Sequence, residues 1–184
     1  MVRTRHLVGL MAGLTLLAGA GTSAPAQDQS APPRALDIVT GVLFYCLPVA
    51  TEAWTKDLCA AMAKEAGSLA KAAKVRFVGL TTQDTDATNK QKARDAGFDP
   101  TNALWLLVKV QRMSPGSRPG WNISLQADAN TVPHPLHKGQ SLRLVFTQGA
   151  TLDAGVSRRE AENAGRMLLE ALFETFSKPM KPPA

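Results

Sequence analysis

Hydrophobic and polar residues alternate in three segments of the carboxy-terminal half of this 184-residue chain. Residues 103–112 place Leu106, Val108 and Val110 on one face and Lys109 and Gln111 on the other. Residues 121–129 and 140–147 alternate in the same way, with apolar positions at Trp121, Ile123, Leu125 and Ala127 and then at Leu142, Leu144 and Phe146. This period of two predicts strands with one buried and one wet face. Residues 75–80 (VRFVGL) predict a fourth strand, because the segment alternates and is rich in β-formers.

Two longer segments have the period of a helix instead. From residue 51 to residue 73, apolar side chains recur every three or four positions, at Trp54, Leu58, Met62, Ala66, Leu69 and Ala73. A second helix is expected to begin after Ser157, which forms a capping box with Glu160, and to bury Ala161, Ala164, Leu168, Leu172 and Phe176. A shorter helix over 83–96 would end at Gly97. The apolar run 35–45 is too short for its period to distinguish a helix from a buried strand.

These elements predict an α+β fold. Two amphipathic helices can cover the apolar face of a one-sided sheet, which gives a two-layer sandwich. We expect a mainly antiparallel sheet of about four strands, covered on one face by the helices. The domain would span residues 35–177, between a polar leader at 27–34 and a proline-containing tail at 178–184, both expected to be disordered.

The amino-terminal segment resembles an export signal. Arg3 and Arg5 precede a small-residue apolar run at 7–20, and Ala24-Pro25-Ala26 has the small-x-small pattern of a cleavage site. Cleavage is therefore expected between Ala26 and Gln27. The apolar run is too short to span a bilayer as a helix, and no cysteine for lipid attachment follows it. We expect a soluble periplasmic or secreted protein without stable membrane insertion.

The distribution of charged residues limits the classes of molecule that the protein is expected to bind. Residues 1–26 carry two of the 21 basic and none of the 15 acidic residues, so the processed chain would hold 158 residues with a net charge of +4. Basic residues are scattered among acidic ones rather than gathered in a stripe, so nucleic acid is not an expected partner.

Both cysteines lie in the part that would be exported. Cys46 and Cys59 are an even pair in an oxidising compartment, where a disulfide is favoured over free thiols. The connecting chain is long enough for closure, and the C-x-x-C spacing of redox enzymes is absent. The prediction is a structural disulfide.

Two loops contain residue types that could carry chemistry. Asp84 and Asp86 follow the predicted strand at 75–80, but the loop lacks the glycine and glutamate of a calcium loop, so a turn and a helix cap are favoured. His134 and His137 are weak candidates for a transition-metal site, and their proline-rich setting favours exposed histidines without a ligand.

No nucleophile, phosphate-binding or zinc-protease motif occurs, so no catalytic residue and no cofactor are predicted. Two classes of function remain open. One is a non-enzymatic envelope module with a protein or cell-wall partner. The other is a periplasmic enzyme, or a ligand- or metal-binding protein, that uses the Asp84/Asp86 or His134/His137 loops.

The order of predicted elements resembles small α+β domains of bacterial envelope accessory proteins. The helix before VRFVGL, the ALWLLVKVQR and WNISLQADA strands and the capped SRRE helix follow the order of the TolB amino-terminal domain and of LpoB-type and CsgG-type proteins. The resemblance covers residues 51–176 and is one of topology alone. It implies an accessory role in the envelope and carries over no site residue.

Overall fold

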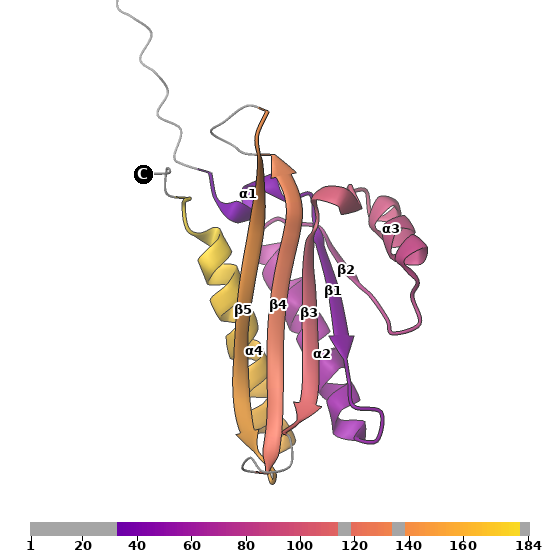
Figure 1. Ribbon diagram of the computed structural model, residues 1–184, viewed down its shortest axis with the longest axis vertical. Coiled ribbons are helices and arrows are strands. Elements are labelled where there is room, and N and C mark those ends of the chain that lie inside the picture. The colour runs from indigo at the N-terminus through magenta and orange to yellow at the C-terminus, as the bar shows by residue number, and fades with distance from the viewer. Residues whose placement is uncertain (1–32, 114–118, 134–138, 181–184) are drawn as a thin grey trace, which may run out of the picture. The chain divides into compact units, whose positions relative to one another are not determined.

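A computed structural model describes residues 33–113, 119–133 and 139–180 of the chain. It is an α+β structure in which five strands form one sheet in the order β2-β1-β3-β4-β5 (Figure 1). The strands are β1 Val42–Leu47, β2 Phe77–Gly79, β3 Leu104–Arg112, β4 Gly120–Pro133 and β5 Ser141–Asp153. The helices are α1 Ala35–Ile38, α2 Ala53–Ala72, α3 Asp86–Asp95 and α4 Arg158–Ser177, with a short 3-10 turn η1 at Pro100–Asn102.

The sheet differs from the expected four-stranded, mainly antiparallel one. The ambiguous run 35–45 divides into the short helix α1 and the start of β1, which supplies the additional strand. β1 pairs in parallel with both β2 and β3, whereas β3, β4 and β5 are antiparallel. Local alternation could not show this, because the direction of pairing depends on residues far apart in the chain.

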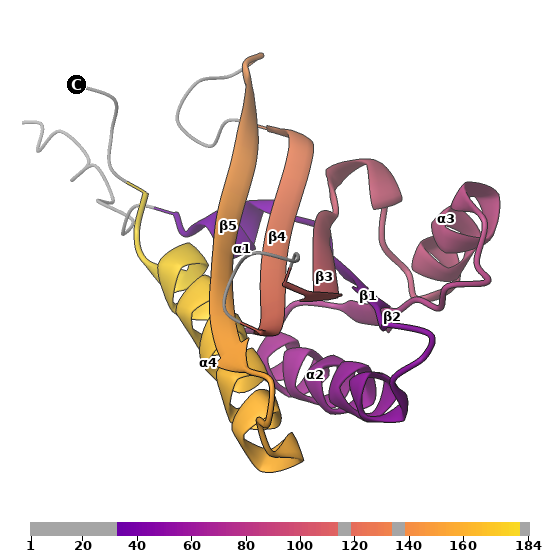
Figure 2. The same ribbon diagram turned by 60° about the horizontal axis from the view of Figure 1, so that its bottom comes forward.

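One face of the sheet packs against α2 and α4, which lie together in Figure 2. The strands turn Phe44, Leu106, Val108, Ile123 and Leu125 toward these helices, and all five side chains are buried. The alternation predicted for β3 and β4 is therefore confirmed. So is the apolar stripe of α2, in which Leu58, Met62 and Ala66 are buried.

In a two-layer sandwich the other face of the sheet would be exposed to solvent. Here part of that face is covered. The segment from α3 to η1 covers its β1 side, where Leu43, Leu80, Ala93, Phe98 and Ala103 form a second small core. The crossovers from β1 to β2 and from β2 to β3 run in opposite directions along the sheet. Right-handed connections then place α2 and α3 on opposite faces. A Cβ at Gly41 would lie 2.6 Å from the Phe98 ring, so glycine is what lets this ring approach β1.

The helix ends follow local sequence signals. Ser157 and Glu160 form the predicted capping box of α4, in which the Ser157 hydroxyl accepts from the Glu160 N–H and the Glu160 carboxylate accepts from the Ser157 N–H. α3 is followed by Gly97 at a φ of 80°, the left-handed conformation expected there.

The two ends of the domain meet. Arg34 and Pro179 form an antiparallel bridge, and the Met180 N–H donates to the Pro33 carbonyl at 3.0 Å. These contacts involve residues on both sides of the range 35–177.

Candidate interaction edge of the sheet

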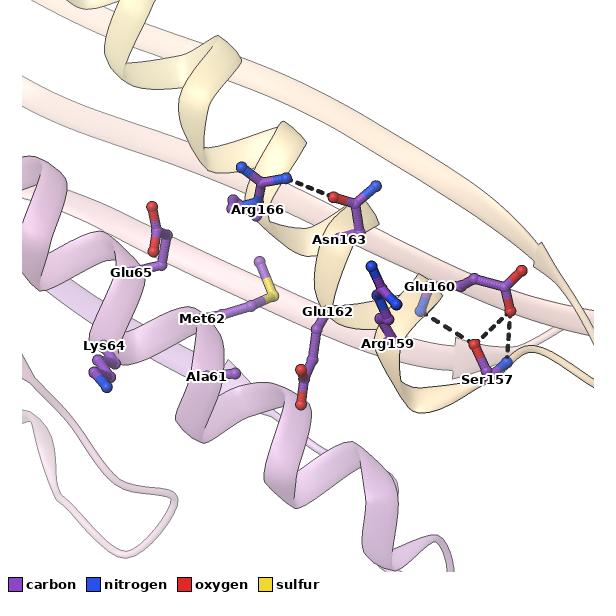
Figure 3. A pocket seen from close by; sticks show the side chains of 10 residues that line it. All are labelled: Ala61, Met62, Lys64, Glu65, Ser157, Arg159, Glu160, Glu162, Asn163 and Arg166. Carbon is purple, nitrogen blue, oxygen red and sulfur yellow. Dashed lines mark hydrogen bonds between the residues drawn. The ribbon is translucent and has the colours of Figure 1, made fainter.

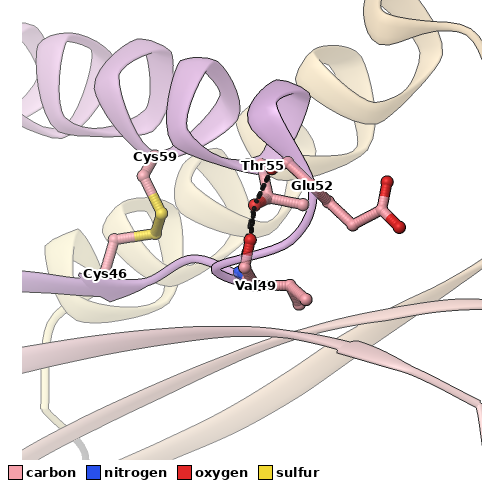
Figure 4. The surroundings of a disulfide bond; sticks show 5 residues. All are labelled: Cys46, Val49, Glu52, Thr55 and Cys59. Atoms are coloured by element: carbon pink, nitrogen blue, oxygen red, sulfur yellow. Dashed lines mark hydrogen bonds between the residues drawn. A yellow bond between two sulfur atoms is a disulfide. The ribbon is translucent and has the colours of Figure 1, made fainter.

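The cysteine pair joins the end of β1 to α2. Cys46 and Cys59 are bonded through their sulfurs, with Cα atoms 5.5 Å apart (Figure 4). The same connection is held by Thr55, a buried polar residue not anticipated from the sequence. Its hydroxyl accepts from the Val49 N–H at 3.0 Å and lies 2.7 Å from the Glu52 carbonyl. Both features hold a loop in place, and neither presents a reactive group.

The Asp84/Asp86 loop has a structural arrangement. The Asp84 carboxylate accepts from the Thr81 N–H and from the Lys92 ammonium, both at 2.7 Å. These hydrogen bonds hold the pKa of Asp84 below its usual value, and the bond from Lys92 has the largest effect. Asp86 pairs with Lys90 one turn along α3, and the N-cap of that helix is Thr85. Asp84 therefore makes the expected turn, whereas the expected helix cap is supplied by Thr85 and not by an aspartate.

The remaining sequence candidates cannot be placed. His134 and His137, and the cleavage site between Ala26 and Gln27, lie outside the described residues. Within residues 33–113, 119–133 and 139–180, no group of three or more histidine, cysteine or acidic side chains is arranged to hold a metal.

A groove of about 860 Å³ runs between the middle of α2 and the amino-terminal half of α4 (Figure 3). Met62 lies between the two helices, and the rim carries Lys64, Arg159 and Arg166 together with Glu65, Glu160 and Glu162. Glu160 is committed to the α4 cap, and Arg166 bonds Asn163 and Glu170. The charges of opposite sign balance, so the groove offers no field that would select a charged ligand.

The outer strand β5 is the most distinctive exposed feature of the sheet. It is 13 residues long, and in the described part of the chain no further strand pairs with its outer side (Figure 1). Between Arg143 and Asp153 it contains no charged residue and no proline. Thr147, Gln148 and Gly149 are all exposed at its centre. Proteins normally protect such an edge with charges, prolines, bulges or a short strand, because its free backbone groups can pair with another chain.

The opposite edge of the sheet is protected. β2 has only three residues, and the adjoining α3 segment packs over the sheet face beside it. The two edges therefore differ greatly in their capacity to accept another strand.

The backbone groups on the free side of β5 can be identified from the ladder. The Met113 N–H donates to the Gly120 carbonyl at 3.0 Å, so even-numbered residues of β4 bond to β3 and odd-numbered ones bond to β5. Through the β4–β5 register, the β5 residues bonded to β4 are even-numbered, among them Phe146 and Gln148. The N–H and C=O groups of residues 145, 147, 149 and 151 consequently point outward.

The alternation in the sequence predicts this strand only over residues 140–147, so its last part, residues 148–153, was not expected. A signal was present: the apolar series Leu142, Leu144 and Phe146 continues at Ala150 and Leu152 with the same period of two. Gln148 and Gly149 interrupt it and look like a turn. In the sheet, Gly149 pairs with Ser124, and the pairing between β4 and β5 continues through it without a break.

No protein-family model matches the chain, and no curated protein matches it in sequence. Among solved structures, it is similar to the PelC dodecamer from Paraburkholderia phytofirmans, with 12% identity and a TM-score of 0.40 over 81% of this chain and 95% of that one. A single-residue variant of that dodecamer gives 12% identity and a TM-score of 0.41, with 81% and 96% covered. These similarities do not assign the chain to a family.

Proposed function

We propose that this chain is an exported, non-enzymatic interaction module of the bacterial envelope, which binds a partner protein by adding a strand to β5. The observation that carries the proposal is the edge itself. It is long and uncharged between Arg143 and Asp153, and residues 145, 147, 149 and 151 each direct one N–H and one C=O outward.

Strand addition would supply the affinity. Each backbone hydrogen bond contributes on the order of 1 kcal/mol net, so a partner strand that pairs with several of these groups binds through the main chain alone. Side chains then add selectivity, because β5 exposes Val145, Thr147 and Thr151 on one face and Gln148 on the other.

Export is supported by two independent features. The first 26 residues have the pattern of a cleaved signal, and the disulfide between Cys46 and Cys59 suits an oxidising compartment. None of the described helices is long and apolar enough to cross a membrane. Amino-terminal sequencing of the purified protein tests the export step and should read from Gln27.

A matched pair of proline variants tests the edge. Thr147→Pro removes an outward N–H from β5 and obstructs pairing there without breaking a bond to β4. Gly79→Pro places the same residue on the protected edge. The Leu80 N–H and the Arg76 carbonyl bond to β1, so Gly79 also faces outward.

Both variants should retain the melting temperature of the parent to within a few degrees. Thr147→Pro should fail to complement a strain that lacks the gene, whereas Gly79→Pro should complement it. Full complementation by a folded Thr147→Pro protein would refute a role for the β5 edge.

A further inference from the structure

We infer that the partner strand on this edge is β5 of a second copy of the same chain, paired antiparallel about a two-fold axis at Gln148. This inference rests on the proposed function, since it names the occupant of the same edge.

The backbone allows such pairing only in certain registers. Opposed residues in an antiparallel ladder must both direct their hydrogen-bonding groups toward each other or both direct them away. The outward groups of β5 belong to odd-numbered residues. An axis at Gln148 places residue 147 opposite residue 149 and residue 145 opposite residue 151, so outward groups meet outward groups. Gln148 meets its own counterpart at a non-hydrogen-bonded position.

Charge selects this register among those that the backbone permits. With the axis at Gln148, Arg143 of each copy lies opposite Asp153 of the other. One pair of opposite charges would then lie at each end of the paired strands. Moving the axis by one residue leaves Arg143 opposite Thr151 or leaves Asp153 opposite Val145. Arg143 already bonds Asp128 of its own chain at 2.5 Å, and its five N–H donors leave capacity for a second carboxylate.

The side chains between the charged ends also fit. On the helix side of the sheet, Leu144 would meet Leu152 and Phe146 would meet Ala150 of the second copy. On the open side, Val145 would meet Thr151. Val145 is 58% exposed and is one of two large hydrophobic side chains that stand out in solvent among the described residues. Pairing would cover part of it.

The centre of the edge is open to solvent. Thr147, Gln148 and Gly149 are exposed on both sides of the sheet, so neither α4 nor the α3 segment covers the position of the axis. The paired edges would form one continuous sheet of ten strands, because each copy contributes five.

Cysteine cross-linking tests the register. In a non-hydrogen-bonded antiparallel pair the Cα atoms are about 4.5 Å apart, which is within the range that a disulfide spans. Gln148→Cys should therefore form a covalent dimer when the full chain is expressed with residues 1–26 and purified without reductant. The matched control is Thr151→Cys, whose counterpart would lie about 20 Å away at roughly 3.3 Å per residue. It should remain uncross-linked.

Light scattering of the parent should give twice the mass of one processed chain. Thr147→Pro should give half the parent's mass at the same concentration and keep the parent's circular dichroism spectrum. If that proline variant does not fold, Thr147→Lys replaces it, since an edge lysine opposes strand pairing at an exposed position.

Three results would overturn the inference: a monomeric parent, a dimer that neither Thr147 variant weakens, or equal cross-linking at residues 148 and 151. A monomeric parent combined with loss of complementation by Thr147→Pro refutes self-pairing alone and leaves a different protein as the partner. Complementation by a folded Thr147→Pro protein refutes the proposed function as well.

Discussion

Gly165 of α4 lies directly against Met62 of α2. A Cβ atom at Gly165 would be 2.8 Å from the Met62 Sδ atom, closer than side-chain atoms approach one another, and Met62 itself is 1% exposed. The absence of a side chain at residue 165 therefore leaves the space that the Met62 side chain occupies between the two helices.

Gly165→Leu should lower the free energy of unfolding by about 1–3 kcal/mol, because it overpacks this contact. Met62→Ala alone should cost about 2–5 kcal/mol through the cavity it leaves. The double variant should lose less unfolding free energy than the sum of the two single losses, by at least about 0.5 kcal/mol. The reason is that the leucine can enter the space that Met62 vacates. Chemical denaturation measures all three.

Gly155→Leu is the matched control for this cycle, because nothing lies within 4 Å of a Cβ at that position. Its stability should stay close to that of the parent. Strict additivity of Gly165→Leu and Met62→Ala would show that the two residues are not coupled.

The disulfide should contribute substantially to stability. Replacing Cys46 and Cys59 together by alanine opens a loop with a sequence separation of 13 and should cost about 3 kcal/mol. Reductant should destabilise the parent by a similar amount and leave the double variant unchanged. Thiol titration of the unfolded, unreduced parent should find no free thiol, and two titratable thiols would contradict the prediction.

Asp84 should make stability depend on pH in acid. Hydrogen bonds from Lys92 and Thr81 lower its pKa in the folded protein, so its contribution is fully present above the unfolded value of about 4 and is lost as pH falls through the folded pKa. Parent and Asp84→Asn should therefore differ in melting temperature at pH 7 and converge below about pH 4.

Asp86→Asn is the control for this series. The Asp86 side chain is 72% exposed, and its pair with Lys90 is a surface pair. Such pairs contribute at most about 1 kcal/mol, so this variant should differ little from the parent at any pH. A gap between parent and Asp84→Asn that persists unchanged to pH 2 would exclude the ionised carboxylate as its cause.

The two loop histidines should be dispensable. Pro133, Pro135 and Gly139 flank them in the sequence, and this composition predicts an exposed loop. The double variant His134→Ala, His137→Ala should change stability by less than about 0.5 kcal/mol and should complement a deletion strain. Loss of complementation with unchanged melting would indicate a metal or catalytic site in this loop.

Local sequence signals determined several elements of this protein. Three signals each lie within one element and occur in the structure as predicted. They are the stripe that includes Leu58 and Met62, the capping box at Ser157 and the alternation from Leu106 to Val110. Such signals suffice because a helix face or a strand face repeats every few residues.

Tertiary structure decided how these elements are combined. β1 lies between β2 and β3, in parallel with both, and α3 covers the face opposite α2. Strand order and direction arise from pairing between residues such as Phe44 and Leu106, which no local period encodes. The length of β5 was decided in the same way. Gln148 and Gly149 have weak strand preference, but their places opposite Leu125 and Ser124 keep the strand continuous to Asp153 and create the exposed edge.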